Sequence, residues 1–66
     1  MIQLKVNGMT CGHCEAGVRE ALAAVPGVTA VTRVDREAGV AEVEGSADVA
    51  ALIAAVVEEG YEAEVA

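Results

Sequence analysis

The spacing of apolar residues switches several times along this chain, and the order of the switches restricts the fold more than any other feature. Residues 2–6, 28–34, 40–44 and 61–65 alternate between apolar and polar or are rich in β-branched residues, which predicts four strands. Two other stretches carry apolar residues three and four apart, which predicts two helices. Their apolar stripes are Cys14, Val18, Ala21, Leu22 and Val25 in the first, and Val49, Leu52, Ile53 and Val56 in the second.

The predicted elements follow one another as strand, helix, strand, strand, helix, strand. This order is the split-βαβ pattern of the α+β ferredoxin-like fold, in which a four-stranded antiparallel sheet carries two helices on one face. No linker interrupts residues 1–66, so we expect a single domain. Turn signals separate the elements at Asn7-Gly8, Pro26-Gly27, Arg36–Gly39 and Gly45-Ser46.

Some local details of the elements can also be predicted. Val31 and Val34 are three residues apart, so both can face inward only if a bulge lies between them. Either Ser46 or Asp48 can cap the second helix, and Gly60 suits a left-handed position at its end. Strict alternation in the last strand places three residues inward, namely Tyr61, Ala63 and Val65.

Composition excludes several classes of function. Tyr61 is the only aromatic residue among 66, so the core must be small and aliphatic. A deep cavity for an organic substrate is therefore not expected, and we expect no enzyme. The net charge of −7, with only four scattered basic residues, argues against nucleic acid as a partner.

The same sequence bears on location and on the state of the cysteines. No stretch reaches the roughly 18 apolar residues of a membrane span, and residues 1–8 lack the features of a secretory signal. We therefore expect a cytoplasmic protein without membrane insertion. Thiols are kept reduced in that compartment, so the two cysteines are expected to serve reactivity or metal binding.

The stretch GMTCGHC, residues 8–14, holds both cysteines and the only histidine. It lies between the first predicted strand and the first predicted helix, whose positive end stabilises anions such as thiolates. Cys11, Cys14 and at most His13 are too few donors for a structural zinc site or an iron–sulfur cluster. Two thiolates suffice for Cu(I), which accepts near-linear coordination, so the ligand set favours Cu(I).

A second interpretation of Cys11-Gly12-His13-Cys14 is a redox centre, because CGHC is also the inner sequence of disulfide isomerases. Its context is unlike that of a thioredoxin-like enzyme, since Thr10 replaces the usual preceding aromatic residue. The only proline, Pro26, lies at a predicted helix end. A small thiol–disulfide oxidoreductase, which would be an enzyme and not a metal carrier, is therefore kept as the alternative function.

The motif GMTCGHC resembles the GMTCxxC signature of heavy-metal-associated domains, which occur in copper chaperones and copper-transporting P-type ATPases. Residues 25–28 (VPGV) and 45–65 also resemble the family, so the resemblance spans essentially the whole chain. It implies that Cys11 and Cys14 bind Cu(I) and that a membrane ATPase receives it. Thr10 and Tyr61 resemble the copper-handling and bacterial members, whereas Arg33 stands where the family usually has an apolar residue.

Roles can also be predicted for the residues around the cysteines. We expect Met9 to anchor the loop from the core and not to bind metal. His13 is expected to face solvent and is a candidate accessory ligand. Thr10 and Tyr61 are expected to support the sulfurs, Tyr61 by packing near the loop and shielding them.

The sequence thus predicts a cytoplasmic Cu(I) metallochaperone that holds copper through Cys11 and Cys14 and delivers it to a copper-transporting P-type ATPase by ligand exchange. We expect a monomer without copper, and copper bridging of two copies through four sulfurs stays open. The alternative within metal biology is an isolated metal-binding domain of such an ATPase.

Overall fold

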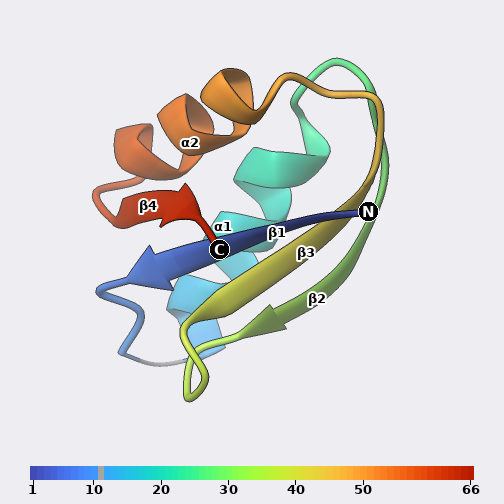
Figure 1. The fold of residues 1–66 in the computed structure, drawn as a ribbon. Helices are drawn as coiled ribbons and strands as arrows, with labels where there is room; N and C mark the ends of the chain where they lie inside the picture. Colours follow the sequence, from blue (N-terminus) through green and yellow to red (C-terminus); the bar gives the residue numbers. More distant parts are fainter. Residues whose placement is uncertain (11) are drawn as a thin grey trace.

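Four strands and two helices follow one another in the predicted order in the computed structural model, which describes residues 1–10 and 12–66 (Figure 1). They are β1 (Ile2–Asn7), α1 (Gly12–Ala23), β2 (Val28–Asp35), β3 (Val40–Gly45), α2 (Val49–Glu58) and β4 (Glu62–Val65). Within the described residues neither helix is long and apolar enough to cross a membrane.

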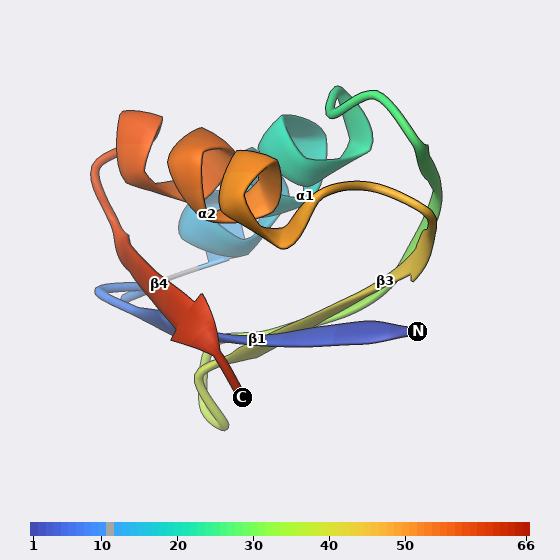
Figure 2. The same ribbon diagram turned by 45° about the horizontal axis from the view of Figure 1, so that its top comes forward.

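The strands form one antiparallel sheet in the order β2-β3-β1-β4. Both helices lie on the same face of this sheet, as the turned view in Figure 2 shows. The two central strands, β1 and β3, therefore lie beneath the helices, and β2 and β4 form the edges. The ferredoxin-like fold predicted from the sequence is confirmed.

The core between sheet and helices is small and aliphatic, as the composition predicts. Alternate residues of the central strands meet the apolar stripes of the helices, since that is the side of the sheet that the helices cover. The residues that are at most 1% exposed are Leu4, Val6, Val18, Leu22, Ala41, Val43, Leu52 and Val56.

The predicted bulge in β2 is present. Val31 pairs with Val43, and Val34 pairs with Ala41. The two β2 residues are three positions apart in the sequence, whereas their two β3 partners are only two positions apart. The register shifts between Val31 and Arg33, so both valines share the face of the buried β3 residues. Arg33 pairs with Glu42 on the open face of the sheet, which explains a charged residue at this position.

Val65 lies on the inward face of the sheet, as predicted, but it is not buried there. Val65 pairs with Leu4 and so shares its face, but its side chain is 59% exposed. The reason is that β4 is an edge strand, and the helix layer does not reach over its last residue. Tyr61 and Ala63, earlier in the same segment, are half-buried against the core.

The helix ends depend on single side chains. Asp48, and not Ser46, caps α2, because its carboxylate accepts a hydrogen bond of 3.0 Å from the amide of Ala50. Gly60 ends α2 with φ of 96°, and its amide donates to the carbonyl of Val57. The first helix ends at Ala23, before the Pro26 that was expected to stop it, and Val25 is buried from the turn that follows.

Three connections meet at one end of the sheet, namely the β1–α1 loop, the β2–β3 hairpin and the α2–β4 connection (Figure 1). The amide of Val6, near the end of β1, donates to the carbonyl of Gly39 in the hairpin at 2.8 Å. The end of β1 that leads to the cysteine motif is therefore held against the hairpin.

Candidate metal centre

Cys14 lies in the first turn of α1, which places its thiol at the positive end of the helix dipole. Its side chain is half-buried and packs against the core. Cys11, the other expected ligand, lies outside the described residues. Of the two predicted ligands the structure thus describes Cys14. Its sulfur lies at the boundary between core and solvent, in a position that suits an anionic thiolate.

Thr10 and Cys14 interact across the start of the helix. The distance between Thr10 Oγ1 and Cys14 Sγ is 3.8 Å, and either atom can be the donor. When the sulfur is a thiolate, the hydroxyl is the donor, because a thiolate has no proton to give. Thr10 can therefore stabilise the charged form of the sulfur that a metal requires.

Met9 belongs to the core and not to the surface of the site. Its side chain is 8% exposed and belongs to the cluster of buried apolar residues beneath the helices. The thioether therefore fixes the loop that carries Thr10, while its burial keeps it away from solvent.

Tyr61 packs against the loop at Gly8. A Cβ atom added to Gly8 would lie 3.3 Å from Tyr61 Cδ1, which is tighter than an ordinary contact. Gly8 also has φ of 102°, in the region that residues with a side chain rarely adopt. The aromatic ring and the loop therefore need a glycine between them, at the first position of the GMTCGHC motif.

His13 lies on the exposed side of the first turn of α1. Among the described residues no group of three or more His, Cys, Asp or Glu side chains is arranged to hold a metal ion. The described residues thus do not bring His13 together with Cys14 as part of a larger ligand cluster.

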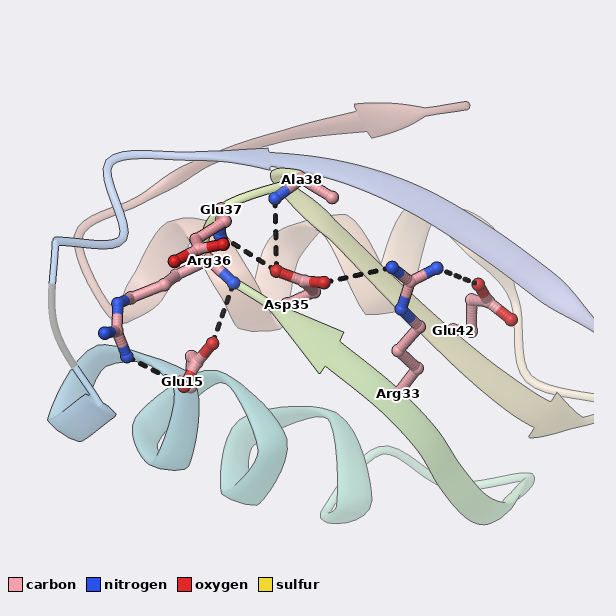
Figure 3. Close-up of polar contacts among 7 residues, drawn as sticks. All are labelled: Glu15, Arg33, Asp35, Arg36, Glu37, Ala38 and Glu42. Atoms are coloured by element: carbon pink, nitrogen blue, oxygen red, sulfur yellow. Dashed lines mark hydrogen bonds and ion pairs between the residues drawn. The ribbon is translucent and has the colours of Figure 1, made fainter.

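The structure adds a feature that sequence reasoning missed, an ion pair between α1 and the β2–β3 hairpin (Figure 3). Glu15 Oε2 accepts from the backbone amide of Arg36 at 2.8 Å, and Glu15 Oε1 lies 3.3 Å from Arg36 Nη1. The same guanidinium nitrogen would lie 3.8 Å from a Cβ at Gly12. The topology could have revealed it, because the start of α1 and the β2–β3 hairpin lie at one end of the sheet, where Glu15 and Arg36 carry opposite charges.

The arrangement suits a soft metal ion bound by sulfur. The start of the helix and the hydroxyl donor beside Cys14 both stabilise negative charge on the sulfur. Soft ions such as Cu(I) bind thiolates in preference to oxygen and nitrogen donors. The described residues offer no carboxylate cluster of the kind that harder ions need.

Comparison with known proteins identifies the family. The sequence model of the heavy-metal-associated domain matches residues 3–62. This chain belongs to the heavy-metal-associated domain family. The match includes the GMTCGHC motif, so the positions of Cys11 and Cys14 lie within the domain.

Relatives of this heavy-metal-associated domain occur in several kinds of protein. Copper-transporting ATPase 2 of Rhizobium meliloti is 47% identical over 62 residues, which are 91% of this chain and 8% of the ATPase. The chain thus spans a small part of the length of this relative. The apo copper chaperone of Enterococcus hirae is 32% identical with a TM-score of 0.91, and the match covers 100% of both chains.

A third relative handles a different metal. The N-terminal domain of Tn501 mercuric reductase, solved as a complex with Hg(II), is 43% identical with a TM-score of 0.80. The match covers 100% of this chain and 97% of that one. The same fold therefore occurs in relatives named for copper and in one solved with Hg(II), so the fold alone does not set the metal.

Proposed function

We propose that this heavy-metal-associated domain is a cytoplasmic Cu(I) carrier that holds copper between the thiolates of Cys11 and Cys14. The observation that carries the proposal is Cys14 in the first turn of α1, half-buried and within reach of the Thr10 hydroxyl. In the proposed site both thiols lose a proton to solvent and each sulfur forms one bond to copper. Two ligands leave copper accessible to a third sulfur.

Transfer to the partner follows from this low coordination. A thiolate of a copper-transporting P-type ATPase bonds to the copper, which becomes three-coordinate, and one cysteine of the carrier then leaves. A second exchange completes the transfer, and copper keeps its oxidation state throughout. The ATPase relative and the chaperone relative support this choice of partner and cargo. The domain acts as a carrier and not as a catalyst, and we expect it to be monomeric without copper.

The experiment that tests the copper site is a titration of the reduced protein with Cu(I) against a competing chelator, with Zn(II) in parallel. We expect one Cu(I) per chain and a much weaker affinity for Zn(II). Replacing Cys11 or Cys14 by Ser removes one of only two ligands, so the Cu(I) affinity falls by at least about a hundredfold. The fold survives, because Cys14 is not among the fully buried residues.

His13→Ala is the matched control, since it changes an exposed residue between the two cysteines. We expect it to bind Cu(I) nearly as well as the wild type. Tight Cu(I) binding by the Cys11→Ser, Cys14→Ser double variant, or a preference for Zn(II), would show that the site is wrongly assigned. Substantial insulin reduction would favour the oxidoreductase interpretation.

A second candidate is a metal-binding domain within a longer copper-transporting ATPase, which the 47% identical relative favours. An antibody against the domain distinguishes the two on a denaturing gel of the source cells. A free carrier gives a band near the 6.7 kDa of this chain, whereas an ATPase domain gives a band many times larger.

A further inference from the structure

Arg36 is the cationic side chain that the described structure places against the start of α1. Its backbone amide and its guanidinium both bind the carboxylate of Glu15, at 2.8 and 3.3 Å. Two contacts to one carboxylate fix both the hairpin and the direction of the side chain. Figure 3 shows the guanidinium extending from the hairpin towards the first turn of the helix.

The residues around this charge place it beside the start of α1. Gly12, which directly follows Cys11, is the residue whose added Cβ would lie 3.8 Å from Arg36 Nη1. Glu15, the other partner, directly follows Cys14. The guanidinium therefore lies beside the first turn of α1, the turn that carries Cys14. It is 41% exposed, so water partly screens its charge.

Soft metal ions of one geometry differ in the charge of their dithiolate complexes. Two thiolates and a monovalent ion such as Cu(I) or Ag(I) form a complex with one negative charge. Two thiolates and Hg(II) form a complex of the same near-linear shape with no net charge. A fixed positive charge nearby stabilises the first complex and leaves the second unchanged to first order.

We propose that Arg36 is a specificity-determining residue that makes this site favour monovalent over divalent soft metal ions. The proposal rests on the dithiolate site of the proposed function. It assigns the selection to charge, since Ag(I) and Hg(II) share both ligands and geometry. Glu15 holds the guanidinium in place, and replacing Arg36 also exposes the Glu15 carboxylate, which disfavours the anionic complex further.

This selectivity does not depend on the protonation of the metal-free cysteines. If both thiols are protonated, binding releases two protons for either ion, and only the monovalent product is charged. If one thiol is already a thiolate, the divalent ion removes a negative charge that Arg36 stabilises, whereas the monovalent ion keeps it. The ratio of the two affinities changes by the same factor in both cases, because the same two products are compared.

The test is a competition between wild type and Arg36→Gln in one solution. The two reduced proteins are mixed in equal amounts with less metal than sites, and native mass spectrometry measures which protein carries the metal. A trace of glutathione allows the metal to exchange. We expect the wild-type preference for Ag(I), divided by its preference for Hg(II), to be about threefold to tenfold, given partial screening of the charge by water. This quotient is the same whether the metal-free site is neutral or already carries one thiolate.

Two further variants separate charge from structure. Arg36→Lys keeps the positive charge and should retain most of the preference for Ag(I). Arg33→Gln removes the same charge from the open face of the sheet, where Arg33 contacts Asp35 and Glu42, and should leave both ratios near one. The preference for Ag(I) should also shrink when sodium nitrate is added, because salt screens exposed charges.

Three outcomes of this competition would contradict the proposed role of Arg36. Loss of affinity for Ag(I) and Hg(II) by the same factor in Arg36→Gln would assign Arg36 a structural role only and overturn the inference. Equal division of both metals would overturn it as well, with the copper-carrier function untouched. If neither protein binds Ag(I), the proposed dithiolate site and the role of Arg36 both fail.

Discussion

Gly8 and Tyr61 show how a single residue shapes the loop that carries the cysteines. Gly8 has φ of 102° and faces the ring of Tyr61, so it meets two separate constraints. Gly60 has a similar φ of 96° but no atom within 4 Å of an added Cβ. The two glycines therefore allow the cost of the backbone conformation to be measured apart from the cost of the contact.

We predict that Gly8→Ala destabilises the fold more than Gly60→Ala. Both variants place a Cβ in the left-handed region, which costs about 1–2 kcal/mol. Gly8→Ala also forces the tyrosine ring to move, which adds up to about 1 kcal/mol. Urea unfolding measures the free energy of unfolding of both variants. In a Tyr61→Ala background, Gly8→Ala should cost only as much as Gly60→Ala does, because the ring is no longer there to be displaced. Equal destabilisation by the two alanines would mean that the ring yields without cost.

At this scale the sequence predicts some positions and not others. The burial of Met9 and the exposure of His13 follow from residue type and place in the pattern. The pair of Glu15 and Arg36 does not, because its members are 21 residues apart and no local pattern relates them. Only the assembled fold brings these charges together. The location of the Cys11 sulfur stays a prediction.

At the scale of elements, the β2–β3 hairpin depends on Asp35. Its Oδ1 accepts from the amides of Glu37 and Ala38 at 2.9 and 3.1 Å, and its Oδ2 accepts from Arg33 at 3.0 Å. The hydrogen bond from the Ala38 amide and then that from Arg33 hold the pKa of Asp35 below its ordinary value of 3.8. The carboxylate form is therefore favoured by the folded hairpin.

We predict that Asp35→Asn removes part of the acid sensitivity of the fold. A carboxyl whose pKa is lower in the folded state stabilises that state above its unfolded pKa, and the contribution is lost as pH falls through the folded value. The stability advantage of the wild type over Asp35→Asn should thus shrink below pH about 4. Urea unfolding across this range measures it. Arg33→Gln should keep most of the effect, and a pH-independent difference would contradict the prediction.

The elements themselves could be predicted because their signals are local. The inward positions of Val31 and Val34 required a bulge, and the register shift of β2 supplies it. Alternation also gives the correct face for Val65, but it does not predict that this residue is exposed. Alternation gives the face of a residue, but burial also depends on how far the helix layer extends over an edge strand.

At the scale of the whole molecule, charge opposes compactness. The chain carries 11 acidic and four basic residues, and the core that holds it together contains no residue larger than leucine or methionine. The ion pairs of the described residues lie at the surface, where each contributes little. Repulsion among the remaining carboxylates therefore acts on the fold as a whole.

We predict that the melting temperature rises by several degrees between about 20 mM and about 500 mM sodium chloride, because salt screens this repulsion over about a nanometre or less. Thermal unfolding followed by circular dichroism measures it. Replacing three exposed glutamates by glutamine (Glu20, Glu58 and Glu62) should flatten the salt dependence. A melting temperature that falls with salt would mean that the surface ion pairs outweigh the repulsion.

Tyr61 is the only aromatic chromophore of the chain, and its ring lies against the loop that leads to the cysteines. Ultraviolet emission from this protein therefore originates at one place, with no tryptophan to obscure it. The molecule carries its own optical probe at the end where cargo is proposed to bind. If loading changes this emission, as we expect from the position of the ring, binding and release can be followed without attaching a dye.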